Sequence, residues 1–198
     1  GRIEGHHFIN IAGFGFDAEV LEETMRGGAL SGYAVYVAAA LRNLFRYPGL
    51  DFSAGGLGTS MRRAMMIVFS NGANFGGTFR IAPDARVDDG LLDLVEVGDV
   101  RGLARLPVFL RVIRGTHLSH PRVCAAQAAA FDLRFTEPPS YECDGELHRA
   151  GSAAVRVRCV RGAIRVMAGA APGAATYSAG TAATADAART SASKDPAS

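Results

Sequence analysis

The second half of the chain consists of short segments that alternate apolar and polar residues and are separated by turn residues. Five such segments follow one another at regular spacing: residues 123–125, 129–135, 140–143, 154–159 and 163–167. Short alternating strands with regular turns are typical of a β-sandwich or a partly closed barrel. Earlier in the chain, the unbroken apolar run 64–69 predicts a buried strand, and residues 7–12, 79–82 and 91–97 predict further strands.

Three segments predict helices. Asp17 is a suitable N-cap for a helix that continues through an acidic first turn to Gly27 and Gly28. Residues 31–46 and 101–114 carry apolar residues at spacings of three and four, as amphipathic helices do. The expected fold class is therefore α+β: a β-sandwich-like domain with about three helices packed on one side or end.

From Ala168 onward the chain is almost entirely Ala, Gly, Ser, Thr and Pro. Such a segment buries too little apolar surface to offset the entropy of ordering it. We therefore expect one folded domain over residues 1–167 and a disordered tail over residues 168–198.

The composition excludes several classes of function. A formal net charge of +2 in 198 residues predicts no nucleic-acid partner. No stretch approaches ~20 consecutive apolar residues, so we expect no membrane span, and the first residues do not resemble a secretion signal. The 3 cysteines are widely spaced, which favours reduced thiols in a cytosolic protein. Lys194 is the only lysine, so the folded part offers no lysine for a phosphate loop or a Schiff base.

Three loops carry residues suited to chemistry. Residues 83–93 bring several carboxylates together, which suits Mg²⁺ or Ca²⁺ but also describes an acidic hairpin turn. Residues 143–148 place Asp144 and Glu146 on either side of Gly145, as a general base on a rigid tip or as an ordinary Asp-Gly turn. Residues 70–77 form a Gly-rich loop that lets backbone approach a ligand or simply crosses between sheets.

The order of these motifs resembles the C-terminal half of the bacterial diacylglycerol kinase and sphingosine kinase-like lipid kinases. The resemblance covers residues 6–167. The motifs that carry it are Phe8-x-Asn10 with Gly13-Phe14-Gly15-Phe16-Asp17-Ala18, Asn71-Gly72 with Phe75-Gly76-Gly77, Ala82-Pro83-Asp84-Ala85 with Asp89-Gly90-Leu91-Leu92-Asp93, Gly115-x-His117, and Asp144-Gly145-Glu146.

The resemblance implies the second of two domains. In this family an α/β domain with a Gly-Gly-Asp-Gly-Thr nucleotide motif precedes a β-sandwich that holds the lipid, and the active site lies between them. The Gly-Gly-Asp-Gly-Thr motif occurs nowhere in this chain. We therefore expect ATP to be bound mainly by the absent N-terminal domain, and the fragment alone to be inactive.

The resemblance also implies roles for individual residues. Glu146 resembles the general base that accepts the proton of the lipid hydroxyl, and Asp144 lies beside the same cleft. The carbonyl oxygens of Arg86 and Leu91 and the carboxylate of Asp89 resemble a Mg²⁺ site. Three further positions are expected to contact substrate in the Gly-rich loop: Asn71, Gly76 and Gly77. Asp17 resembles the acidic position at the lipid head group, and the apolar interior between the sheets is expected to take the acyl chains.

These implications lead to an ATP-dependent kinase that phosphorylates the hydroxyl of diacylglycerol or a related lipid, with Mg²⁺. Two alternatives remain open: a non-catalytic lipid-binding module and an NAD kinase-like enzyme. Expected partners are the lipid substrate and, peripherally, the inner membrane from the cytoplasmic side, and a homodimer is also open. The arginines around the apolar stripe of residues 101–114 suit contact with anionic lipid, whereas an ordinary packed surface helix is the alternative.

Overall fold

The computed structural model describes residues 1–26, 40–55, 60–75 and 79–167. Residues 1–163 form one compact unit, and a second unit begins at Ile164. Residues 164–167, the described part of the second unit, have no regular secondary structure, and the side chains of Val166 and Met167 are exposed. The strand expected at residues 163–167 is therefore wrong. The predicted disordered tail, residues 168–198, lies outside the described residues.

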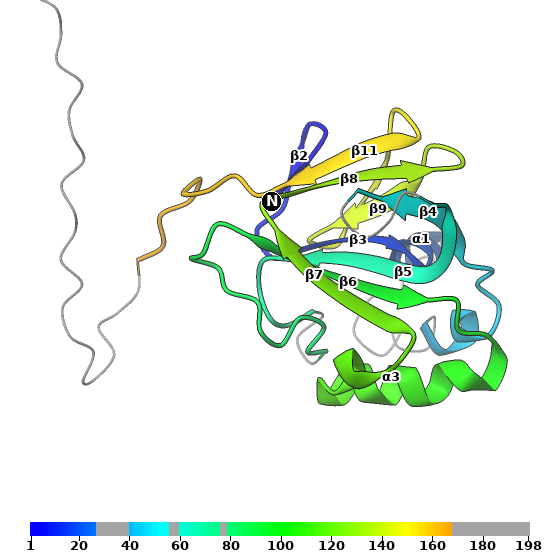
Figure 1. Cartoon of the computed structure of the whole chain (residues 1–198). Coiled ribbons are helices and arrows are strands. Elements are labelled where there is room, and N and C mark those ends of the chain that lie inside the picture. Colours follow the sequence, from blue (N-terminus) through cyan, green and yellow to red (C-terminus); the bar gives the residue numbers. More distant parts are fainter. Residues whose placement is uncertain (27–39, 56–59, 76–78, 168–198) are drawn as a thin grey trace, which may run out of the picture. The chain divides into compact units, whose positions relative to one another are not determined.

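Within the described residues, 11 strands form a single curled antiparallel sheet (Figure 1). The strands are β1 (Arg2–Ile3), β2 (His6–His7), β3 (Ile11–Gly15), β4 (Leu50–Ala54), β5 (Arg62–Ser70), β6 (Leu92–Gly98), β7 (Val123–Ala128), β8 (Ala130–Phe135), β9 (Ser140–Cys143), β10 (Glu146–Arg149) and β11 (Ala154–Arg158). Their order is β10-β9-β3-β5-β4-β8-β11-β1-β2, and β6 and β7 extend from β5. Strand β11 pairs with β8 along one edge and, at Val157 and Arg158, with β1 along the other.

Strand β5 has three neighbours. Along one edge its first residues, from Arg62 to Ala64, pair with β4, and its later residues, from Met66 to Ser70, pair with β3. Its other edge pairs with β6. The sheet consequently divides at β5 into one arm of β3, β9 and β10 and another of β4, β8, β11, β1 and β2. The two arms form the sandwich that the alternating pattern predicts.

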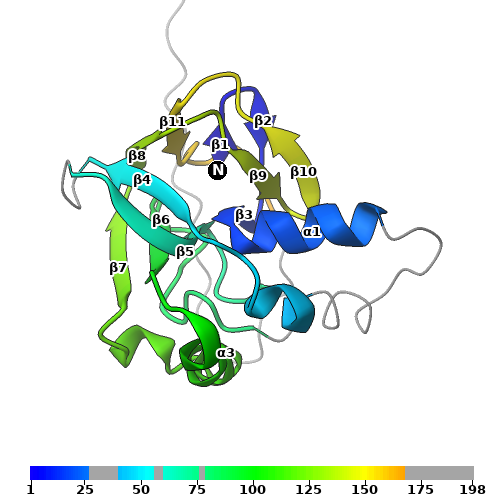
Figure 2. The same ribbon diagram turned by 90° about the vertical axis from the view of Figure 1, so that its right-hand side faces the viewer.

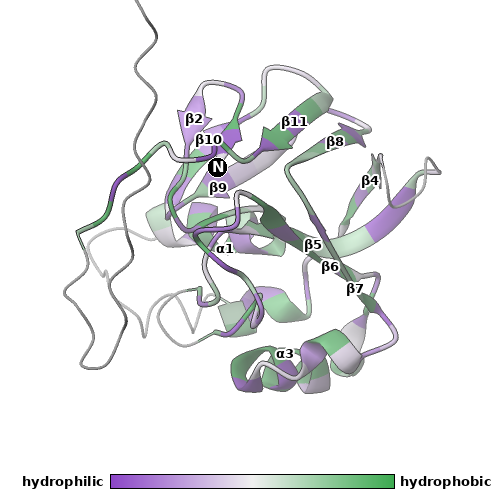
Figure 3. Ribbon diagram, turned by 60° about the vertical axis from the view of Figure 1, so that its left-hand side comes forward, coloured by the Kyte–Doolittle hydropathy of each residue, from purple (hydrophilic) through white to green (hydrophobic). Residues whose placement is uncertain are grey.

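Aromatic side chains fill the space between the arms. Phe14 on β3 stacks on Phe135 of β8, with ring centroids 5.1 Å apart, and also contacts Phe69 and Tyr141. Phe14 and Tyr141 are fully buried. Strand β5, which supplies Phe69, is coloured mainly as hydrophobic in Figure 3. This aromatic cluster joins one arm to the other.

Helices cover the opposite face of β5 and β6 (Figure 2). They are α1 (Phe16–Arg26), the helical residues 40–44, the 3₁₀ turn Gly102–Ala104, α3 (Arg105–Arg114) and the 3₁₀ turn His117–Ser119. Helix α3 ends at Gly115, which adopts the left-handed conformation that glycine permits. A second apolar core, which includes Val20, Val68 and Val108, lies between these helices and the sheet.

Some element boundaries differ from the expectations. Helix α1 begins at Phe16, so Asp17 lies in its first turn and is not the N-cap. Of the helix expected at residues 31–46, the structure describes only 40–46, of which 40–44 are helical; residues 31–39 lie outside the described residues. The strand expected at 79–82 is wrong beyond Phe79, which forms an isolated bridge with Phe75, because the chain bends at Ile81. In the described part of the chain, no helix is long and apolar enough to cross a membrane.

Replacing Phe14 by Ala tests the joint between the arms. The change leaves a cavity among Phe69, Phe135 and Tyr141, so we expect the free energy of unfolding to fall by about 3 to 5 kcal/mol. Urea denaturation followed by circular dichroism measures this. The matched control is Ile9→Ala, since the Ile9 side chain is 65% exposed, and its effect should stay within about 0.5 kcal/mol. Equal effects of the two changes would contradict this account of the core.

Candidate functional site

Asp17 is a buried carboxylate at the start of α1. Gly15 has a φ of +101°, which lets the chain turn from β3 directly into the helix. The side chain of Asp17 then folds back over β3, where a Cβ at Gly13 would collide with its Oδ2. Asp17 is only 3% exposed, and among the described residues neither carboxylate oxygen has a hydrogen-bond partner. Burial raises its pKa, although the nearby backbone N–H groups of Ala18 and Asp17 partly oppose this.

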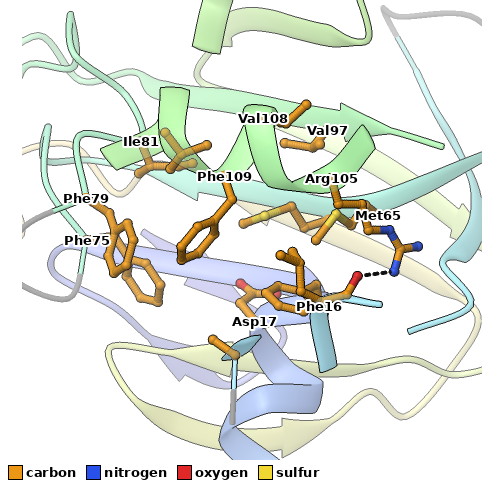
Figure 4. Close-up of a pocket in the computed structure, with 14 residues that line it drawn as sticks. Phe16, Asp17, Met65, Phe75, Phe79, Ile81, Val97, Arg105, Val108 and Phe109 are labelled. Carbon is orange, nitrogen blue, oxygen red and sulfur yellow. Dashed lines mark hydrogen bonds between the residues drawn. The ribbon is translucent and has the colours of Figure 1, made fainter. Parts of the chain in front are cut away.

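Asp17 lines an apolar pocket between the sheet and the helices (Figure 4). The space not occupied by atoms, including the open mouth, is about 580 Å³. Among the described lining residues, Asp17 and Arg105 are the charged ones and the rest are apolar. They are Phe16, Ala40, Leu44, Met65, Met66, Phe75, Phe79, Ile81, Val97, Val108, Phe109 and Val112. The pocket therefore lies on the helical face of the sheet, not between the arms as expected, because aromatic side chains fill that space.

Arg105 fixes one wall of this pocket. Its guanidinium donates hydrogen bonds to the carbonyl oxygens of Val100 (2.5 Å), Leu44 (2.7 Å) and Tyr47 (2.7 Å). Helix α3 is thereby attached to the end of helical residues 40–44 (Figure 4) and to the segment that follows them. Desolvation by burial lowers the pKa of Arg105. Burial and, after it, the charge of Asp17 raise the pKa of Tyr47.

Glu142 is a second buried carboxylate beside Asp17. It lies on β9 opposite Gly13, so the two positions face the same side of the sheet. Glu142 is 2% exposed; its Oε2 accepts the N–H of Gly145 (2.9 Å), and its Oε1 has no partner among the described residues. Burial and then the charge of Asp17 raise the pKa of Glu142. The sequence shows Glu142 only as an alternating polar residue of a strand, and α1 is what buries it.

The turn between β9 and β10 carries Asp144 and Glu146. Asp144 and Gly145 both have positive φ, as in a two-residue hairpin turn. The Asp144 carboxylate accepts the N–H groups of Ile9 (2.6 Å), Asn10 (3.0 Å) and Ile11 (2.9 Å). The Glu146 side chain is 82% exposed, with its Oε2 3.8 Å from Nε2 of His148. Asp144 therefore holds the chain before β3, while Glu146 faces solvent.

Asn71 supports the same segment from the other side. Its Nδ2 donates to the carbonyl oxygen of Ile9 (2.8 Å), and its backbone N–H donates to Asn10 (2.8 Å). The structure thus brings two predicted site residues, Asn71 and Asp144, together on one segment. Gly76 and Gly77 lie outside the described residues.

The predicted Mg²⁺ loop lies at the same end of the sheet. Asp144 bonds Ile11, Ile11 pairs with Ser70, and Ser70 pairs with Asp93 of β6. At a strand spacing of about 4.8 Å, three steps separate the two acidic turns by about 14 Å. The β9–β10 hairpin and the loop before β6 therefore lie at the same end of the strands. We call this end of the sheet, which carries the two acidic turns, the acidic edge.

The carboxylate and carbonyl oxygens of the loop are the ligands that a hard cation prefers. Asp89 accepts the N–H of Leu91 (2.8 Å) and, through Oδ2, the amide of Gln127 (3.2 Å). Burial raises the pKa of Asp93, and the charges of Asp89 and Asp84 raise it further, so negative charge converges there. Arg86 pairs with Asp88 (3.2 Å) through its side chain, and the role expected of Arg86 at the cation is that of a backbone carbonyl ligand. No group of three or more His, Cys, Asp or Glu side chains in the described ranges is arranged for a metal, so a cation here would depend on backbone oxygens.

These features define a class: a β-sandwich-like domain with an apolar pocket under its helices and an acidic sheet edge. The fold is similar to that of a diacylglycerol kinase from Bacillus anthracis, with a TM-score of 0.52 and 19% identity over 79% of this chain and 52% of that one. Residues 10–168 match the family described as the YegS C-terminal NAD kinase beta sandwich-like domain. The chain belongs to that family.

Relatives by sequence carry related names. A YegS-like lipid kinase of Xanthomonas euvesicatoria is 28% identical over 170 residues, covering 81% of this chain and 52% of the relative. A diacylglycerol kinase of Staphylococcus carnosus is 27% identical over 149 residues, covering 74% and 48%. The chain therefore spans about half the length of the relatives it matches, and the predicted relation to lipid kinases is confirmed.

The role of Asp144 in holding residues 9–11 leads to a prediction. Asp144→Asn keeps a residue that tolerates positive φ but removes one acceptor oxygen and the charge. We expect the amides of Ile9, Asn10 and Ile11 to exchange with solvent about fivefold faster, a change of about 1 kcal/mol in local stability. Hydrogen exchange followed by NMR measures this. Glu146→Gln, on the same hairpin, should leave these rates unchanged; unchanged rates in Asp144→Asn would show that the three contacts carry no stability.

Proposed function

We propose that this chain is the acceptor-binding half of an ATP-dependent lipid kinase, which transfers the γ-phosphate of ATP to a hydroxyl of diacylglycerol or a related lipid. Membership of the family and the names of the relatives support a kinase-family protein. The observation that carries the proposal is the pairing of an apolar pocket with an acidic edge on one sheet. The Gly-Gly-Asp-Gly-Thr nucleotide motif is absent from the sequence, so the proposal assigns phosphate binding to a further domain.

The pocket suits the hydrocarbon part of the acceptor. Its walls are nearly all apolar, and two methionines, Met65 and Met66, line it next to a register shift in β5. Methionine side chains adapt to flexible apolar ligands. Asp17 supplies a polar group at the wall, where the head group of the lipid would lie.

The acidic edge suits the reacting end. Glu146 is exposed on a hairpin whose position Asp144 fixes, so it can accept the proton of the lipid hydroxyl as phosphoryl transfer proceeds. When bound, Mg²⁺ neutralises negative charge on the phosphates and at the acidic edge. Asp89 and the carbonyl oxygens of Arg86 and Leu91 would hold it. Asn71, with Gly76 and Gly77 from the adjoining loop, completes the expected substrate contacts.

Helix α3 supports contact with a membrane surface on the cytoplasmic side. Its buried side lines the pocket, while Leu106, Leu110 and Ile113 are about two-fifths exposed (41%, 41% and 40%) on the outer side. Leu103, in the preceding 3₁₀ turn, is 79% exposed. Arg111 and Arg114 are exposed in the last turns, and the helix contains no acidic residue. Figure 3 shows both hydrophobic and hydrophilic bands on this helix. An apolar stripe with flanking arginines fits an anionic bilayer.

A non-catalytic lipid-binding module is the second candidate, and the pocket itself favours it. The two candidates differ in whether phosphate is transferred. They are separated by assaying the whole protein that contains this chain with ATP, Mg²⁺ and dioctanoylglycerol.

In that assay, Glu146→Gln removes the proposed base without changing its size. We expect turnover to fall about 100-fold or more, since general base catalysis contributes at least that factor. The measurement is transfer of labelled phosphate to the lipid. Asp132→Asn, an exposed carboxylate change on β8, is the matched control and should keep wild-type turnover. Unimpaired turnover in Glu146→Gln would remove Glu146 from the base role.

Reversing charge on α3 tests the membrane contact. For the double change Arg111→Glu and Arg114→Glu, we expect binding to vesicles that contain phosphatidylglycerol to weaken at least tenfold, since each basic residue contributes about 1 kcal/mol. Co-sedimentation with vesicles measures this. The control reverses the same amount of charge on β11, through Arg156→Glu and Arg158→Glu. Equal losses in both variants would show that net charge, and not α3, determines binding.

A further inference from the structure

Two carboxylates meet over Gly13: Asp17, which the proposed function places at the lipid head group, and Glu142, to which it assigns no role. The antiparallel register places Gly13 opposite Glu142, and Gly13 has no side chain to occupy the space above it. Asp17 fills that space from α1. Both carboxylates are more than nine-tenths buried, and three of their four oxygens have no partner among the described residues.

Within the part of the chain that the structure describes, the surroundings contain little to balance two negative charges. Across the pair, Asp144 on the hairpin adds a further negative charge, and the Gly145 N–H is the one described donor bonded to Glu142. Tyr47, on the segment after helical residues 40–44, carries a neutral hydroxyl, and burial followed by the charges of Asp17 and Glu19 raises its pKa. Among the described lining residues Arg105 is the cation, and its guanidinium donates to the carbonyl oxygens of Val100, Leu44 and Tyr47. Two adjacent buried carboxylates without a cation cannot both ionise.

We propose that Asp17 and Glu142 share one proton and that this pair binds the hydroxyl end of an uncharged lipid alcohol in the apolar pocket. The inference rests on the proposed function and names its acceptor class. Asp17 contacts the lipid, and Glu142 is a positioning residue that acts through Asp17. A pair with one proton offers both a donor and an acceptor, which matches a hydroxyl group.

The same pair discriminates between lipid classes. A glycerol-type alcohol binds without any change in protonation. A cationic amino alcohol such as sphingosine favours ionisation of both carboxyls, so its binding should release a proton. While the pair holds the shared proton, it therefore favours an uncharged acceptor. Once the pair has lost this proton, the preference disappears.

The test measures binding of dioctanoylglycerol to the chain as a function of pH by calorimetry. In the wild type, we expect affinity to fall about tenfold as pH rises through the loss of the shared proton, since one hydrogen bond is lost. Glu142→Gln keeps a permanent donor beside Asp17, so it should bind as the wild type does at low pH and should hold that affinity as pH rises. Glu142→Ala should bind about tenfold more weakly already at low pH. A residue with a purely structural role would not move the pH profile.

Two controls complete the experiment. Carbon-13 NMR of labelled carboxyl groups should show two separate titration steps for the pair, and a single lower step for Asp17 in Glu142→Gln. Glu137→Gln, at an exposed position, should change neither the titration nor the binding. Binding with the same pH profile in the wild type and Glu142→Gln would overturn this inference. It would not contradict the proposal that the pocket binds lipid. No binding to the wild type at any pH would overturn the pocket proposal as well.

Discussion

The pairing of β5 with three other strands determines where the remaining parts of the fold lie. Because β4 and β3 share one edge of β5 in succession, the strands that follow each of them must diverge. The aromatic cluster around Phe14 fills the resulting space, so the interior of the sandwich is closed. The helices then cover the outer face of the sheet, over β5 and β6 and, through α1, over β3 and β9, and the cavity forms between them and that face. The position of the pocket is thus a consequence of strand pairing.

The same register aligns the chemical groups. Cys143, Ala12 and Phe69 lie in one row across β9, β3 and β5, so the turn at Asp144, the loop at Asn71 and the start of β6 reach one end of the sheet. One residue further along, Gly13 and Glu142 form the next pair, on the face that α1 covers. The buried carboxyl pair therefore lies between the pocket and the acidic edge. A side chain at position 13 would prevent this arrangement, because it would displace Asp17.

The sequence predicts the strands whose apolar pattern is complete, such as β5, β6 and β8, and it predicts α3 from its apolar spacing. It does not predict β4, since Leu50–Ala54 mixes apolar with polar residues, and it indicates β10 only as the strand that follows the Asp-Gly turn, since Glu146–Arg149 is mostly polar. Both segments become strands because they pair with neighbouring strands. The site residues likewise fall into those that the sequence predicts and those that it does not. Asp144, Asn71 and Asp17 follow from motifs, whereas the burial of Glu142 depends on α1, and the pocket depends on packing between elements distant in sequence.

Burying two adjacent carboxyl groups opposes folding unless a proton accompanies them. Their folded-state pKa values lie above those of the unfolded chain, so their presence is least unfavourable at low pH and destabilises the fold as pH rises past the folded-state values. An apolar pair of similar volume would fold more easily at neutral pH. The two acids in the wall of this otherwise apolar cavity do not stabilise the fold. Their benefit therefore lies in what they contact.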